Sequence, residues 1–164
     1  MNKSEKIFLR DTCIYCIKNY SILNSSPIIS SLIYQICKMS NIDCMPVRGI
    51  VKIRINQNIT RTFAHCFNVG DGIIIDASIY EYAIMHKQIS DSIPFYVVEN
   101  IPCSIEYIVE SELPRNHQFN FPDTFLKNII KNIKSAKKLS LYKFNMIDDS
   151  KKSNLFFCRQ NFNT

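Results

Sequence analysis

The stretch from Phe63 to Asp76 restricts the fold of this chain more than any other part of the sequence. Two runs rich in β-branched and aromatic residues flank Gly70-Asp71-Gly72, a strong turn signal, and together they predict a β-hairpin. If the first two turn residues form the loop, His65 lies directly opposite Asp76; if the last two form it, Asp76 faces Phe67 and lies diagonal to His65. Both registers put the two polar side chains on one face of the sheet, because successive strand residues alternate faces. A histidine held beside a carboxylate is a general base with its orienting group, so the hairpin predicts part of a catalytic triad.

The composition is that of a folded globular chain. Its 164 residues are enough for one domain with a proper core, 46% of them are hydrophobic, and Phe and Tyr are plentiful although Trp is absent. With three glycines in all, the chain has no glycine-rich phosphate loop, which excludes nucleotide-binding proteins of that kind. The formal net charge is +6, with much of the excess after Lys127, and it favours acidic partners without specifying a function.

The cysteines indicate a reduced protein. There are seven, an odd number, and the charged start Met1–Lys6 does not resemble a secretory signal. The apolar runs are too short to span a bilayer, so we expect a cytoplasmic protein, or one delivered from the cell without a signal peptide. Cys13 and Cys16 form a single CxxC with no second pair at zinc-binding spacing. We interpret them as small apolar residues on a helix and expect no metal and no cofactor.

Two helices are predicted at the start of the chain. The first covers residues 4–19, with Ser4 as its cap and Ile7, Ile14 and Ile17 at roughly helical spacing. The second begins at Ser25-Ser26-Pro27, because proline at the first helical position with serine before it is a start signal. It ends near Ser40. Its apolar residues share one face, which predicts a central, buried helix: Ile29, Leu32, Ile33, Ile36 and Cys37.

The remainder of the chain predicts a largely antiparallel sheet. Alternating apolar residues indicate a strand over 47–55, the hairpin follows, and a short helix is expected within 77–87. Two more strands are predicted at 95–98 and 105–109. The fold class is therefore α+β, with N-terminal helices packed on an antiparallel sheet. We expect a single domain over residues 1–148 and a loosely ordered tail over 149–164.

A last helix, over about 122–139, is amphipathic and basic. Phe125, Leu126, Ile129, Ile130 and Ile133 form its apolar face, and Lys127, Lys131, Lys134, Lys137 and Lys138 cover the rest. We favour a docked helix with a solvated lysine face. The alternatives are a surface for an acidic partner, for a membrane or, least favoured, for nucleic acid, which a steep salt dependence of binding would reveal.

A nucleophile for the hairpin is expected at the start of the second helix. The first turn of a helix has free N–H groups and the positive end of the dipole, which stabilise a thiolate or an oxyanion.

Here the sequence resembles the papain-like, transglutaminase-like superfamily over roughly residues 20–82. The segment from His65 to Asp76 is similar to the motif H-x-W-x-x-x-D-G-x-x-x-x-D, with Phe67 at the Trp position. Asn41–Gly49 looks like the G-I-P-A-R-V-V-x-G segment that follows the family's buried helix.

The resemblance implies a cysteine where this chain has Ser26. Three explanations compete: a native serine nucleophile, a pseudoenzyme, or a form of the chain in which the nucleophilic cysteine was replaced by serine. We favour the third, and any codon other than Cys at position 26 of the gene contradicts it. The alternative to all three is a plain N-cap role for Ser26. Three cysteines are weaker nucleophile candidates. Cys37 is expected in the buried middle of the helix and Cys44 lies past the helix end. Cys66 alternates to the strand face opposite His65.

The resemblance implies a thiol-dependent amide hydrolase or acyltransferase: a peptidase, a deamidase or a transglutaminase-like enzyme. Residue 26 would attack an amide carbonyl of a protein or peptide substrate, His65 would be the base, and Asp76 would hold the imidazole. Asn24, or else Asn19, could supply an oxyanion-hole amide. A bacterial effector or a peptide-maturation enzyme would suit the small size. The second hypothesis is a non-catalytic binding module of the same fold, engaging an acidic protein or nucleic acid through the lysine-rich helix.

Overall fold

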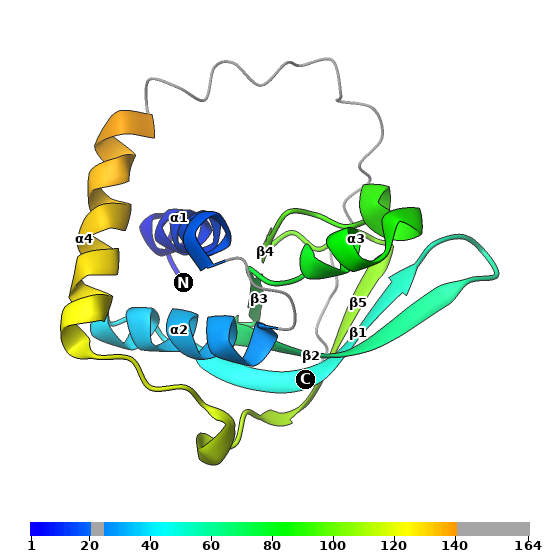
Figure 1. Ribbon diagram of the computed structural model, residues 1–164, viewed down its shortest axis with the longest axis horizontal. Coiled ribbons are helices and arrows are strands. Elements are labelled where there is room, and N and C mark those ends of the chain that lie inside the picture. Colours follow the sequence, from blue (N-terminus) through cyan, green and yellow to red (C-terminus); the bar gives the residue numbers. More distant parts are fainter. Residues whose placement is uncertain (21–24, 141–164) are drawn as a thin grey trace.

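The protein is an α+β structure, seen here in a computed structural model that describes residues 1–20 and 25–140, with side chains up to residue 135 (Figure 1). The predicted tail and the side chain of Lys138 lie outside the described residues. The elements follow in the order α1 (Lys3–Tyr20), α2 (Ser26–Met39), β1 (Met45–Arg54), β2 (Thr60–Gly70), β3 (Ile73–Asp76), α3 (Glu81–Met85), η1 (Lys87–Ser92), β4 (Val97–Val98), β5 (Ile105–Glu112), η2 (Arg115–His117) and α4 (Asp123–Ser140). The two N-terminal helices, the hairpin and the last helix all form where the sequence predicts them.

The strands form one five-stranded sheet in the order β4-β3-β2-β1-β5, and every neighbouring pair is antiparallel. Asp71 and Gly72 form the loop between β2 and β3, with φ angles of 52° and 70°, as a type I′ turn requires. Asn68 therefore pairs with Ile75, which places Asp76 at the position across from Phe67. Of the two predicted registers, the one with Asp76 diagonal to His65 is correct.

Helices α1, α2 and α4 gather at one side of the molecule, and the tip of the β1–β2 hairpin extends away from them (Figure 1). Two buried apolar clusters fill the interior. One lies among these three helices and includes Leu9, Cys13, Ile33, Ile36, Ile75, Leu126 and Ile129. The other lies around the buried ring of Phe67 and includes Val51, Ile74, Ile79, Tyr82, Ile89 and Tyr107. Neighbouring residues of β3 divide between the clusters, so the sheet separates them.

Helix α1 differs from its prediction at the cap and on the buried face. Asn2 and Glu5 exchange reciprocal hydrogen bonds between side chain and backbone N–H, at 2.7 and 3.0 Å, and form a capping box. The predicted cap Ser4 was wrong, because it already lies inside the helix. The buried residues are Leu9, Thr12, Cys13, Cys16 and Ile17, whereas Ile7 and Ile14 are half-buried. Cys13 and Cys16 are fully buried, as expected of small apolar residues in a core.

Hydrogen bonds of Ser30, the fifth residue of α2, hold this helix against β2. The Ser30 hydroxyl donates to the Phe67 carbonyl oxygen at 3.0 Å, and the side-chain amide of Asn68 donates to the Ser30 carbonyl oxygen at 3.0 Å. Ser26 lies one turn earlier, on the same side of the helix as Ser30. The two bonds therefore hold the first residue of α2 beside the part of β2 that contains Cys66.

Within the described residues, no helix is both long and apolar enough to cross a membrane.

Candidate active site

The hairpin brings His65 and Asp76 together. Nε2 of His65 lies 2.8 Å from Oδ2 of Asp76, and both side chains are almost wholly buried, at 1% and 0% exposure. β2 supplies the histidine and the last residue of β3 supplies the aspartate. The short I′ turn fixes the offset between the two strands, so the contact follows from local sequence. Two of the three predicted triad residues are therefore in direct contact.

Asp76 accepts hydrogen bonds from several directions. Its Oδ1 atom accepts from the backbone N–H of Ser78 at 2.8 Å, from the Ser78 hydroxyl at 3.0 Å and from the Ile79 N–H at 3.1 Å. Burial opposes the charged form, but His65 and these donors outweigh it and hold the pKa of Asp76 below its ordinary value. Asp76 is therefore an ionised carboxylate inside the protein.

Tyr107 is a member of this network that the sequence pattern did not identify. Its hydroxyl donates to Oδ2 of Asp76 at 2.8 Å, and burial together with the neighbouring Asp76 charge raises the pKa of Tyr107 well above its ordinary value. The phenol therefore stays protonated and remains a donor. Tyr107 belongs to β5, which pairs with β1 and not with either hairpin strand that supplies His65 and Asp76. Only the order of strands in the sheet could have revealed it.

Tyr82, in α3, contacts the other nitrogen of the His65 ring. Its hydroxyl lies 2.9 Å from Nδ1 of His65 and 3.2 Å from the carbonyl oxygen of Ala64. The ionised Asp76 requires a proton on Nε2, so in the neutral imidazole Nδ1 is the acceptor and Tyr82 donates to it. When Nδ1 is protonated, the same hydroxyl can accept from it and donate to Ala64. Tyr82 can therefore bond the ring in both protonation states.

Ser26, the third predicted residue, lies at the start of α2 with its hydroxyl on the edge of β2. Its Oγ accepts from the backbone N–H of Cys66 at 3.3 Å, and among the described residues no hydrogen bond joins it to the His65 ring. The N-cap residue is Ser25 and its side chain makes no cap bond, so the N-cap interpretation of Ser26 is wrong. Burial raises the pKa of the half-buried Cys66 thiol, while a hydrogen bond with Ser26 lowers it. Residue 26 and the Cys66 thiol are therefore neighbours.

A buried carboxylate holds the start of α2 from the other side. Glu81, the first residue of α3, is 4% exposed, and its Oε1 accepts from the Ser25 hydroxyl at 2.5 Å. The Ser25 backbone N–H lies 3.4 Å from Oε2 of the same carboxylate. A carboxylate at the positive end of a helix dipole is favourable. α3 thus contributes Glu81 to the start of α2 and Tyr82 to the histidine.

The other predicted site residues lie elsewhere or outside the described residues. Asn24 is outside the described residues. Asn19 is exposed at the end of α1, where its side-chain amide donates to the Tyr15 carbonyl oxygen. Cys37 and Cys44 are buried, and the pKa of Cys37 is raised by its contact with Cys44 and by burial. Over residues 1–20 and 25–140, no group of three or more His, Cys, Asp or Glu side chains could hold a metal ion.

None of the protein-family models matches this chain, and neither the curated proteins nor the solved structures include a significant match. The chemistry of the site therefore rests on its own geometry. That geometry comprises a helix N-terminus with a hydroxyl, a buried histidine on the strand beside it, and a carboxylate on the next strand.

Proposed function

We propose that this chain is an acyl-transfer enzyme of the papain-like, transglutaminase-like type, acting on amide carbonyls of a protein or peptide. Residue 26 is the nucleophile, His65 is the general base and Asp76 orients the imidazole. The observation that supports this assignment is the buried 2.8 Å contact between His65 and Asp76, on the strand whose next residue donates its N–H to the Ser26 hydroxyl. The assignment applies to serine at position 26. It applies equally to a cysteine there, which is the better nucleophile.

Two features of the position favour a charged nucleophile. The Cys66 N–H points at the reacting atom, and the first turn of α2 adds the positive end of its dipole. Both interactions stabilise a thiolate or alkoxide more than the neutral group. Glu81 holds the preceding residue and so limits movement of the helix start.

The reaction proceeds in two steps. The side chain of residue 26 loses its proton to Nδ1 of His65 and attacks the carbonyl carbon. The tetrahedral intermediate then collapses as the carbon–nitrogen bond breaks, and the Nδ1 proton passes to the departing amine. Water, or an amine acceptor, releases the acyl group in the second step by the same proton transfers. Tyr82 must give up its bond to Nδ1 for the proton to arrive, and the Ala64 carbonyl oxygen remains as its acceptor.

A thiol-labelling experiment tests the proposal. The variant Ser26→Cys, Cys66→Ser places a thiol at position 26 and removes the neighbouring thiol that could trap it as a disulfide. We expect iodoacetamide to alkylate residue 26 faster than a free cysteine, by roughly tenfold or more at pH 7, because its thiolate fraction is raised. Adding His65→Gln should abolish the excess rate, and mass spectrometry of peptides separates this site from the exposed Cys103. Labelling at the free-cysteine rate in the folded protein would contradict the proposal.

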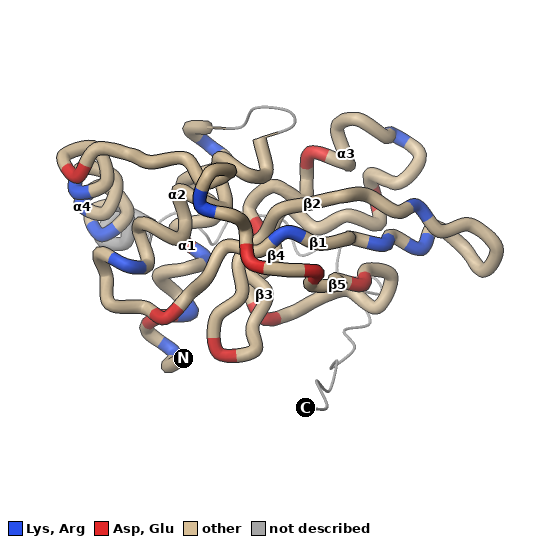
Figure 2. The backbone as a smooth tube through the Cα atoms, turned by 90° about the horizontal axis from the view of Figure 1, so that it is seen from below, with Lys and Arg blue, Asp and Glu red and all other residues tan. Residues whose placement is uncertain are grey.

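The second candidate function is a non-catalytic binding module. The observation that favours it is the arrangement around His65, whose Nδ1 atom is bonded to Tyr82 and whose ring is 1% exposed. Lys127, Lys131 and Lys134 of α4 are exposed, and Lys and Arg residues mark this helix in Figure 2. Slow labelling at position 26, combined with binding of an acidic protein that is lost on neutralising these lysines, would favour this candidate.

A further inference from the structure

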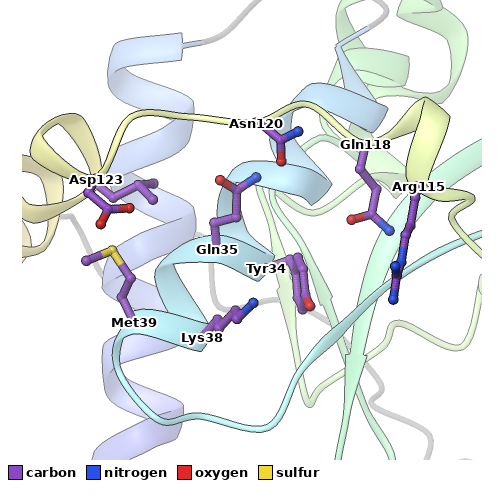
Figure 3. A pocket seen from close by; sticks show the side chains of 9 residues that line it. Tyr34, Gln35, Lys38, Met39, Arg115, Gln118, Asn120 and Asp123 are labelled. Atoms are coloured by element: carbon purple, nitrogen blue, oxygen red, sulfur yellow. The ribbon is translucent and has the colours of Figure 1, made fainter.

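A polar cleft lies at the far end of α2 from Ser26. It has a volume of about 720 Å³ and opens between the C-terminal half of α2, the η2 segment and the start of α4. Figure 3 shows side chains from all three elements around it, among them Tyr34, Lys38, Arg115, Gln118 and Asp123. The volume falls within the range of ligand sites in proteins. None of these residues belongs to the His65 network.

Hydrogen bonds, most of them to α2, hold the wall of the cleft in place. The Gln35 side chain donates to the Phe119 carbonyl oxygen and accepts from the Phe121 N–H at 3.1 Å. The Phe119 N–H donates to the Ser31 hydroxyl at 3.1 Å, and the Gln118 amide donates to the Leu113 carbonyl oxygen at 2.7 Å. An irregular segment fixed at this many points is already formed before a ligand arrives. Binding there costs little ordering entropy.

The cleft has an excess of positive charge. Lys38 and Arg115 line it and, among the described residues, form no ion pair. Lys38 also suits the negative end of the α2 dipole, whereas Arg115 has no comparable structural reason for its position. Asp123 is the one carboxylate in the lining. In Figure 3 it lies at the opposite end of the cleft from Arg115, so the charge is distributed unevenly.

We propose that this cleft binds an acidic segment of a polypeptide. Carboxylates of the segment pair with Lys38 and Arg115, and the fork of an arginine suits a carboxylate. The side-chain amide of Asn120, which also lines the cleft, can donate to and accept from a peptide backbone. A nucleic acid fits less well, because its regularly spaced phosphates need a longer basic track than Lys38 and Arg115 provide.

If the proposed acyl-transfer function holds, the cleft is placed to select the substrates that reach residue 26. Lys38 lies roughly 18 Å from Ser26 along the axis of α2, at about 1.5 Å per residue. An extended chain of about six residues spans that distance. The cleft would then select substrates with an acidic stretch at this separation from the reacting amide. Peptide binding itself does not depend on chemistry at residue 26.

Fluorescence anisotropy with the full chain tests the proposal. The probe is a labelled peptide of Gly, Ser and four Glu, compared with the same peptide containing Gln, at about 0.15 M ionic strength. We expect the Glu peptide to bind at least tenfold more tightly. Lys38→Gln and Arg115→Gln should each weaken it by roughly threefold to tenfold, because each removes one charged contact. Asp123→Asn should tighten it, and circular dichroism checks that the variants are folded.

The matched control is Lys131→Gln, which removes the same charge from an exposed lysine of α4 that does not line the cleft. Its affinity should stay within twofold of the unmodified chain. Equal affinity for the Glu and Gln peptides overturns the proposal, as does an equal loss in Lys131→Gln. Displacement of the probe by a single-stranded oligonucleotide as effectively as by unlabelled Glu peptide also overturns it. Intact peptide binding with slow labelling at position 26 would contradict only the proposed catalytic function.

Discussion

The Tyr82 hydroxyl lies 2.9 Å from Nδ1 of His65, on the ring nitrogen that does not face Asp76. This is the nitrogen that would take a proton from residue 26. A hydroxyl that can both donate to it and accept from it stabilises the ring without fixing its charge. The structure therefore presents a histidine whose two nitrogens are both satisfied from within the fold.

Replacing Tyr82 with Phe should show whether its hydroxyl competes with residue 26 for Nδ1 of His65. In the Ser26→Cys, Cys66→Ser chain, we expect Tyr82→Phe to speed alkylation of residue 26 severalfold, because Nδ1 loses its internal partner. The cost in folding free energy should be about 1 kcal/mol, the usual net value of one hydrogen bond. Alkylation kinetics and urea unfolding measure the two effects. Slower alkylation in the folded variant would assign Tyr82 a supporting role in the chemistry instead.

Asp76 should make the stability of the fold depend on acid pH. Its pKa is lowered in the folded protein, so its contribution is complete above the unfolded value of about 4 and disappears as pH falls through the lowered folded pKa. Asp76→Asn should cost about 3 kcal/mol at pH 7, because it removes one partner of a buried pair.

Below about pH 4, Asp76→Asn should also flatten the decline of stability with acid. Asp91→Asn removes an exposed carboxylate outside this network and is the matched control, so its cost at pH 7 should stay below about 0.5 kcal/mol. Urea unfolding at a series of pH values gives the measurement. Parallel curves for the unmodified chain and Asp76→Asn would show that Asp76 titrates alike in the folded and unfolded states.

Gly49 should not tolerate a side chain. It lies opposite His65 in the β1–β2 ladder, and a Cβ atom there would stand 2.0 Å from the Ile108 carbonyl oxygen, where the register of β1 and β5 shifts. We expect Gly49→Ala to destabilise the fold by more than about 2 kcal/mol, because backbone must move. Gly72→Ala is the contrast: its Cβ would meet open space, and the cost of about 1 kcal/mol comes from its positive φ. Thermal unfolding of both variants measures the two losses of stability, and the larger loss is expected for Gly49→Ala.

The Ser25–Glu81 contact should hold the start of α2. Ser25→Ala removes the hydroxyl that donates to a carboxylate buried to 4% exposure, and we expect a loss of about 1–3 kcal/mol. Ser25→Thr keeps the hydroxyl and should restore most of it. In the labelling chain, Ser25→Ala should also slow alkylation of residue 26 relative to Ser25→Thr. Unchanged stability in Ser25→Ala would mean that other donors satisfy Glu81.

The parts of the site that the sequence predicted are those set by local patterns. The run from His65 to Asp76 contains its own turn, so a period of two residues was enough to place both side chains on one face. Ser25-Ser26-Pro27 marked the start of α2 for an equally local reason. Tyr107 and Glu81 were missed because their contacts depend on strand order and on how α3 packs. The hydrogen bond from the Cys66 N–H to Ser26 was not predicted either, since it depends on where Ser30 holds the helix against β2.

The network also has an order of assembly built into its sequence separations. His65 and Asp76 are 11 residues apart, His65 and Tyr82 are 17, Asp76 and Tyr107 are 31, and Ser25 and Glu81 are 56. The entropy lost on closing a loop grows with its length, and isolated hairpins form within microseconds. The histidine and its carboxylate can therefore meet while most of the chain is still unfolded. The tyrosine donors and the helix start join later, so the interior is closed around a hydrogen-bonded pair that has already formed.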